Sequence, residues 1–152
     1  RVALISFRDQ GAQLVLSPTS SVQLANLRVR ELATGGATPL NHGLAMALQV
    51  AKRELRRDPD VMPVLVLITD GQGNVGYLSD NPVRESLELA AKIREEGLAC
   101  VVFDTSAMPS HTREGRPLFS HARRIADIMG AEYHRLAHPQ PREMVDRLKK
   151  PL

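Results

Sequence analysis

The second half of the chain alternates short apolar runs with segments of helical period. Val61–Thr69 is a continuous apolar run that indicates a strand covered on both faces, and Leu98–Phe103 and Glu132–Leu136 are further strand candidates. Helical segments follow these runs at residues 82–96, before Gly130, and from Pro141. Chains that alternate in this way form parallel sheets covered by helices. We therefore expect a doubly wound, mainly parallel α/β sheet with helices on both faces.

The first half opens with two strand-like runs, Arg1–Phe7 and Ala12–Leu16. The polar turn between them indicates an antiparallel hairpin. A helix capped by Ser20 or Ser21 follows, and a second helix starts at Thr38-Pro39 and runs to about Arg57. Apolar residues recur at helical spacing in these two helices and in the last two of the chain. The residues expected on the apolar faces are Val22, Ala25, Val29 and Leu32; Leu40, Leu44, Leu48, Ala51 and Leu55; Leu118, Ala122, Ile125 and Met129; and Met144, Val145 and Leu148.

Length and composition favour one domain that binds neither nucleic acid nor membrane. With 152 residues and 43% hydrophobic content, the chain suits one buried core. Aromatic residues make up only 3%, too few for base-stacking surfaces, and the basic residues near Arg56 suit a solvated helix end. No apolar stretch approaches the roughly 20 residues of a membrane span. The single Cys100 lies in an apolar run, which suits a small buried side chain and a cytoplasmic location.

Ligands of doubly wound sheets bind beyond the carboxyl ends of the strands. Residues 34–38, 70–76 and 104–106 occupy such positions. Asp70 directly follows an apolar strand and Thr38 precedes a helix, so both offer hard oxygen atoms suited to Mg²⁺, Mn²⁺ or Ca²⁺. Two alternatives remain open: Thr38 is only a helix N-cap, and Asp70 only begins a turn.

Four ordered strings resemble the von Willebrand factor A (integrin I-like, Rossmann-like) domain of magnesium chelatase D subunits. They are Arg1-Val2-Ala3-Leu4-Ile5-Ser6-Phe7, Thr34-Gly35-Gly36-Ala37-Thr38-Pro39-Leu40, Leu67-Ile68-Thr69-Asp70-Gly71 and Val102-Phe103-Asp104-Thr105. The resemblance covers nearly the whole chain. The second and third strings are shared by von Willebrand A domains in general.

The resemblance implies a metal-ion-dependent adhesion site in which Thr38 and Asp70 bind Mg²⁺. Gly35, Gly36 and Asn74 are implied to contact a partner protein. The family's remaining ligands come from an Asp-x-Ser-x-Ser motif after the first, central strand, and neither the motif nor that strand is present here. The domain, residues 1–152, is therefore expected to be incomplete at its N-terminus, with a gap in the sheet between Arg1–Phe7 and Val61–Thr69.

The implied function is protein interaction without catalysis. In the family, the D subunit serves an ATP-dependent magnesium chelatase that inserts Mg²⁺ into protoporphyrin IX during chlorophyll and bacteriochlorophyll synthesis. The implied partners are the AAA+ ATPase subunit and the porphyrin-binding subunit. An acidic side chain of a partner would complete the shell of the bound Mg²⁺.

The sequence also allows three alternatives. A von Willebrand A domain of this kind also suits another AAA+ ATPase, of cobaltochelatase or MoxR type. The Gly-x-Gly-x-x-Gly spacing of residues 71–76 suggests a small nucleotide-binding enzyme domain, but no helix starts within it and no ribose-binding acid follows. A permuted metal site on Asp104 and Ser106 is disfavoured because Met108 holds the third ligand position, so we expect Asp104 at the rim of the sheet.

Overall fold

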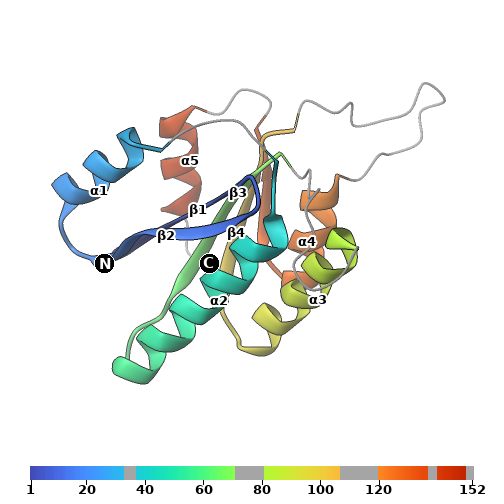
Figure 1. Ribbon diagram of the computed structural model, residues 1–152, viewed down its shortest axis with the longest axis horizontal. Helices are drawn as coiled ribbons and strands as arrows, with labels where there is room; N and C mark the ends of the chain where they lie inside the picture. Colours follow the sequence, from blue (N-terminus) through green and yellow to red (C-terminus); the bar gives the residue numbers. More distant parts are fainter. Residues whose placement is uncertain (33–36, 71–80, 107–119, 137–139, 150–152) are drawn as a thin grey trace. The chain divides into compact units, whose positions relative to one another are not determined.

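The computed structural model describes residues 1–32, 37–70, 81–106, 120–136 and 140–149 (Figure 1). The chain forms two compact units. The first comprises Arg1–Arg53 and Gly73–Ser86, and the second Glu54–Gln72 and Leu87–Leu152. In the described part of the chain, no helix is both long enough and apolar enough to cross a membrane.

The first unit begins with the expected antiparallel hairpin. Strands β1 (Val2–Arg8) and β2 (Gly11–Thr19) pair along their length, from the Val2 and Thr19 pair to the Arg8 and Gly11 pair. Asp9 in the turn has a φ of 56°, in the left-handed region that asparagine and aspartate tolerate better than most residues. The second strand extends three residues beyond the predicted end at Leu16.

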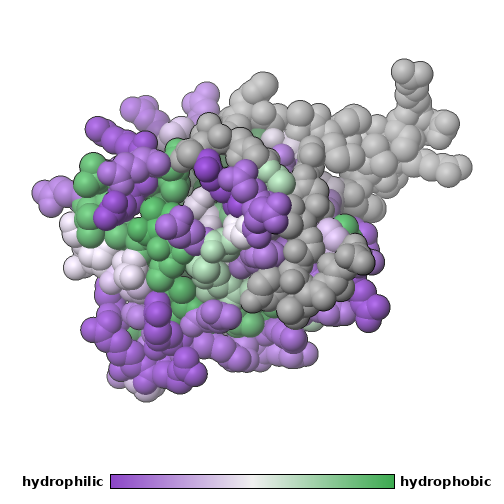
Figure 2. All heavy atoms as spheres, viewed as in Figure 1, coloured by the Kyte–Doolittle hydropathy of each residue, from purple (hydrophilic) through white to green (hydrophobic). Residues whose placement is uncertain are grey.

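Helix α1 (Val22–Arg30) follows, with Ser21 as its N-cap. The Ser21 side chain accepts a hydrogen bond from the Leu24 N–H at 3.2 Å, as the sequence predicted. The apolar face of α1 is not covered, because α1 has no buried residue and Val22 is 71% exposed. Figure 2 shows apolar residues on the surface over this helix.

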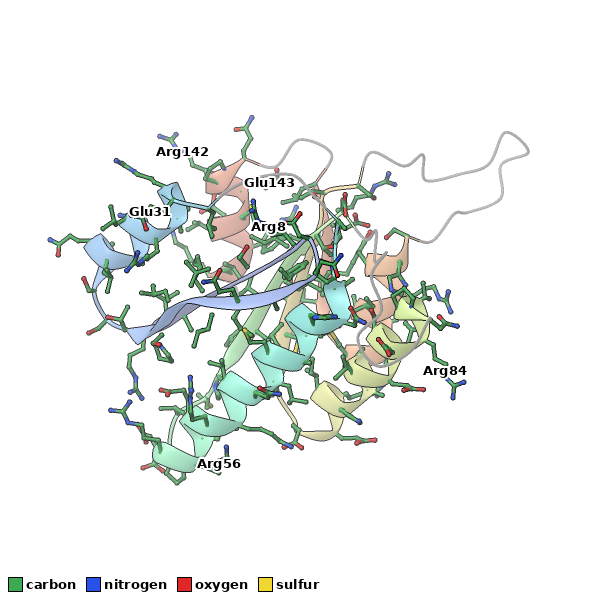
Figure 3. The ribbon with its side chains drawn as sticks, in the orientation of Figure 1. Arg8, Glu31, Arg56, Arg84, Arg142 and Glu143 are labelled. Atoms are coloured by element: carbon green, nitrogen blue, oxygen red, sulfur yellow. The ribbon has the colours of Figure 1, made fainter. Side chains whose placement is uncertain are left out.

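Helix α2 (Leu40–Arg57) carries the core of the first unit. Leu40, Leu44, Leu48 and Ala51 are buried as predicted. The Pro39 oxygen accepts the first helical hydrogen bond, from the Gly43 N–H at 3.2 Å, so the helix starts one residue later than expected. The hairpin packs against the first turn of α2, where the Phe7 ring lies on Gly43. At the other end of α2, Arg56 extends into solvent as expected of a basic helix end (Figure 3).

The second unit contains the predicted parallel sheet, so the α/β fold class is confirmed. Strands β3 (Val64–Thr69), β4 (Ala99–Asp104) and β5 (Glu132–Arg135) lie in that order and are all parallel (Figure 1). Strand β4 is central and buried, including Cys100, whose pKa is raised by burial to about 11. Its thiol is therefore protonated at neutral pH.

Helices α3 (Pro82–Glu95), α4 (His121–Met129) and α5 (Pro141–Leu148) follow the strands. The expected glycine stops are confirmed: Gly97 and Gly130 both have a φ of 67°, a conformation that favours glycine. Helix α4 buries Ala122, Ile125 and Met129 as predicted, whereas Leu118 lies outside the described residues.

Two predicted apolar faces are not buried. Helix α5 packs Met144 against the cluster of Val101, Phe103 and Leu136, but Val145 and Leu148 of this helix are exposed. Strand β3 is covered on one face only, since the alternate residues Val64, Val66 and Ile68 are 47%, 41% and 51% exposed. Within the described residues β3 pairs with β4 alone, so it is the edge of its sheet. A continuous apolar run did not distinguish this half-covered edge strand from a fully buried one.

The contact between Phe7 and Gly43 gives a test of the first unit. An ideal Cβ on Gly43 would lie 2.6 Å from Cδ1 of Phe7, too close without a shift of the ring. Gly43→Ala is therefore expected to lower the free energy of unfolding by about 1–3 kcal/mol, despite the higher helix propensity of alanine. Urea unfolding measures this. In a Phe7→Ala background the same substitution should be neutral or stabilising, and an equal loss in both backgrounds would contradict the contact.

Candidate functional site

Asp70 lies at the carboxyl end of β3 and is exposed, at the position that the sequence predicted. The preceding residue, Thr69, is buried and pairs with Asp104 in the sheet. The Thr69 backbone oxygen also accepts a hydrogen bond from the Thr105 N–H at 2.9 Å. This bond continues the pairing of β3 and β4 past their ends. The backbone directly before the Asp70 carboxylate is therefore held by the sheet.

Thr38 lies two residues before the first residue of α2 and is half-buried. Its backbone oxygen accepts a hydrogen bond from the Leu40 N–H at 2.9 Å. The preceding residue is tied to the hairpin, because the Asp9 N–H donates to the Ala37 oxygen at 2.8 Å. The turn with the left-handed Asp9 therefore holds the chain immediately before Thr38.

The two side chains have the chemistry of a site for a hard cation. A carboxylate and a hydroxyl are oxygen ligands of the type that Mg²⁺ prefers, but they leave most of an octahedral shell to other groups. Thr38 belongs to the first unit and Asp70 to the second. Among the described residues, no three His, Cys, Asp or Glu side chains are grouped so as to hold a metal ion. The residues fit Mg²⁺ in kind, and the role of each as a ligand stays a prediction.

The predicted partner-contacting residues Gly35, Gly36 and Asn74 lie outside the described residues. The same is true of the Gly71–Gly76 loop on which the nucleotide-binding alternative depends.

Asp104 lies at the carboxyl end of the sheet, as expected, but its side chain does not face solvent there. It is the last residue of β4, but its side chain is fully buried. One carboxylate oxygen accepts the Ser106 N–H at 2.8 Å, and the other accepts the hydroxyls of Ser120 and, at 2.6 Å, Tyr133. Ser120 is also the N-cap of α4, where its oxygen accepts the Arg123 N–H at 3.1 Å. The Asp104 carboxylate therefore holds β4, β5 and the start of α4 together, which argues against a permuted metal site there.

The electrostatics of Asp104 follow from these bonds. Burial favours the protonated acid and acts to raise its pKa, but the hydrogen bonds from Ser120, Tyr133 and Ser106 outweigh burial. The pKa of Asp104 is therefore lowered below its ordinary value. The pKa of Tyr133 is raised, first by burial and then by its hydrogen bond to Asp104. The pair is a carboxylate and a neutral phenol at neutral pH.

Sequence reasoning missed a second buried polar pair, which lies within the first unit. The Asn41 Nδ2 in the first turn of α2 donates to the Glu85 Oε2 in the first turn of α3 at 2.5 Å. Asn41 is fully buried and Glu85 is 9% exposed. Asn41 shares helical spacing with Leu44, Leu48 and Ala51, so its position on the apolar face was a signal that its amide needs a buried partner.

Comparison with known proteins identifies related chains. A family model described as the von Willebrand factor type A domain matches residues 1–72. An uncharacterized protein of Methanocaldococcus jannaschii is 30% identical over 149 residues, which are 98% of this chain and 82% of that protein. The magnesium-chelatase 60 kDa subunit of Cereibacter sphaeroides is 40% identical over 112 residues. The magnesium-chelatase 67 kDa subunit of Heliobacterium mobile is 31% identical over 156 residues.

The lengths of these relatives differ. The match to the Cereibacter subunit covers 71% of this chain but only 20% of that protein. The match to the Heliobacterium subunit covers 98% of this chain and 22% of that protein. The chain therefore spans about a fifth of each chelatase subunit. Among solved structures, the conserved hypothetical protein BatB from Bacteroides thetaiotaomicron has a TM-score of 0.64 at 16% identity, covering 96% of this chain and 75% of that one. This last likeness concerns the fold alone.

The buried Asp104 carboxylate predicts a stability that depends on pH. Because its pKa is lowered on folding, the charged form stabilises the folded state above the ordinary aspartate pKa of about 3.9, and this contribution is lost as pH falls through the lower folded value. Asp104→Asn places an amide donor among N–H and O–H donors. The expected cost is about 1.5–3 kcal/mol at pH 7, shrinking toward pH 3.

Denaturant unfolding at a series of pH values measures this difference. Asp127→Asn is the matched control, because that carboxylate is exposed and, within the described part of the chain, pairs with Arg123 alone on the surface of α4. Its effect should stay within about 1 kcal/mol. A loss at Asp104 that is the same at pH 3 and pH 7 would contradict the stabilising role of the charge.

Proposed function

Since the chain belongs to the von Willebrand factor type A domain family, we propose that it binds a partner protein through a divalent cation held by Asp70 and Thr38. The observation that carries the proposal is the position of Asp70. Its exposed carboxylate follows a strand end whose backbone is fixed by the hydrogen bond between Thr69 and Thr105. Ligands of sheets of this type bind at the carboxyl ends of the strands.

The cation we propose is Mg²⁺, because the two side chains offer only oxygen atoms. When bound, Mg²⁺ supplies a coordination position for an acidic side chain of the partner. Asp70 provides the negative charge and Thr38 a neutral oxygen. Further oxygen ligands are required, and the Asp-x-Ser-x-Ser motif that supplies them in related domains is not among these 152 residues.

We propose further that the chain is a non-catalytic interaction domain of a magnesium chelatase D subunit. The similarity to the chelatase subunits of Cereibacter sphaeroides and Heliobacterium mobile supports this. The partners would be the AAA+ ATPase subunit and the porphyrin-binding subunit of the complex that inserts Mg²⁺ into protoporphyrin IX. That inserted ion is a substrate, and it is separate from the ion held by Asp70.

A second candidate is interaction with the AAA+ ATPase of a different system, of cobaltochelatase or MoxR type. It is supported by the von Willebrand factor type A match over residues 1–72, because the strings around Thr38 and Asp70 are shared by von Willebrand A domains in general. Calorimetric titration of the full-length protein with each purified ATPase, with and without Mg²⁺, separates the two candidates. Saturable nucleotide binding without Mg²⁺, lost in Gly73→Ala, would instead support the nucleotide-binding alternative.

Asp70→Ala should abolish saturable binding of Mg²⁺ or Mn²⁺ to the full-length protein, together with Mg²⁺-dependent affinity for the partner. Because Asp70 is exposed, solvent screens the interactions of its carboxylate, and the free energy of unfolding should change by no more than about 1 kcal/mol. Asp60→Ala is the matched control, since Asp60 is an exposed aspartate that precedes β3 instead of following it. Partner binding that survives Asp70→Ala would remove this carboxylate from the function.

Thr38 is tested by two substitutions that differ in one oxygen atom. Thr38→Ser keeps a hydroxyl at the start of α2 and should retain affinity for Mg²⁺, whereas Thr38→Ala should weaken it. If the hydroxyl also caps the helix, Thr38→Ala should lower the free energy of unfolding by about 1 kcal/mol. A change in stability without a change in Mg²⁺ affinity would make Thr38 a structural residue only.

A further inference from the structure

The buried pair of Asn41 and Glu85 lies close in sequence to Thr38 and has one unusual property. The Asn41 Nδ2 donates to Glu85, but among the described residues the Asn41 Oδ1 is buried without a hydrogen-bond donor. Leaving a buried acceptor unsatisfied is costly, and most buried polar atoms have partners. The amide is therefore oriented so that Nδ2 bonds to Glu85, although this leaves Oδ1 without a donor among the described residues.

That orientation follows from the role of the Glu85 Oε2 as an acceptor. A rotated amide would place Oδ1 against the carboxylate, where two acceptors repel, so only Nδ2 can face Glu85. The adjacent residues of α3 confirm that Glu85 points inward. Ser86 is fully buried and donates to the Pro82 oxygen at 2.7 Å, whereas Arg84 points into solvent (Figure 3). The carboxylate thus reaches into the first unit and meets α2 at Asn41.

The chain from Ala37 to Gly43, which contains Thr38 and the first turn of α2, is held at three places. Asp9 binds the Ala37 oxygen from the hairpin, Phe7 lies on Gly43, and Glu85 binds Asn41. The two residues between Thr38 and Asn41 are both fully buried. A shift of the chain at Thr38 would therefore break one or more of these contacts. Of the three contacts, only the one to Glu85 is a hydrogen bond between two side chains. Paired substitutions can therefore exchange its donor and its acceptor.

We propose that the Asn41–Glu85 hydrogen bond is a positioning element of the cation site, which sets the first turn of α2 so that the Thr38 hydroxyl meets the ion. This inference rests on the proposed function. Glu85 and Asn41 act through the backbone of α2 and are not ligands themselves. Groups that orient metal ligands in this way typically change metal affinity by about 10- to 100-fold when removed.

A reciprocal exchange tests the proposal. Asn41→Asp places two carboxylates against each other and should raise the Mg²⁺ dissociation constant of the full-length protein by about 10- to 100-fold. Glu85→Gln alone should have a smaller effect, because an amide oxygen still accepts from Asn41. The double variant Asn41→Asp with Glu85→Gln restores one donor, one acceptor and the net charge, so it should return the dissociation constant to within about threefold of wild type.

Ser86→Ala is the matched control, because it removes a neighbouring buried hydrogen bond without touching the Asn41–Glu85 pair. It should lower the melting temperature in scanning calorimetry. The Mg²⁺ dissociation constant, measured by titration calorimetry well below the melting temperature, should stay unchanged. If Thr38→Ala weakens Mg²⁺ binding while Asn41→Asp does not, the positioning role is overturned and the proposed function stands. If the double variant recovers its melting temperature but not its affinity, the pair is only structural. Absence of Mg²⁺ binding by the wild-type protein overturns both proposals.

Discussion

The second unit depends on one buried carboxylate. Asp104 ends the central strand, and its two oxygens accept hydrogen bonds from Ser106, Ser120 and Tyr133. These donors join the end of β4 to β5 and to the start of α4. A buried charge is tolerated only when it is fully hydrogen-bonded, so these elements must meet at this point. The Thr105 N–H, one residue after Asp104, donates a hydrogen bond to the Thr69 oxygen. This bond fixes the end of β3, directly before Asp70, to the end of β4.

In the first unit, close packing holds the elements together. The Phe7 ring occupies the space that a side chain at Gly43 would fill. The Asp9 N–H, in the hairpin turn, bonds to the backbone directly before Thr38. Asn41 and Glu85 then join the first turns of α2 and α3. In both units the backbone next to the residues proposed to act is held by hydrogen bonds, at Ala37 before Thr38 and at Thr69 before Asp70. Preorganisation of this kind is what a binding site for a small hard cation requires.

The fold was largely predictable because its signals are local. Helical spacing identified α2 and α4 with their buried faces, Gly97 and Gly130 marked helix ends, and the strand runs identified the parallel sheet. The errors concern burial. Apolar residues of α1, α5 and one face of β3 are exposed, including Val22, Val145 and Ile68. Periodicity reports which residues share a face of an element, but whether another element covers that face is a property of the whole arrangement.

The sequence by itself determined the α/β alternation, the hairpin and the positions of Thr38 and Asp70, because each depends on residues within a few positions of one another. Only the tertiary structure decided that Asp104 is a buried junction, since its partners Ser120 and Tyr133 lie 16 and 29 residues away. The same holds for Asn41 and Glu85, which are 44 residues apart. A polar residue in an apolar segment signals that a partner is needed, but the identity of that partner follows from folding, which brings distant donors and acceptors out of water together.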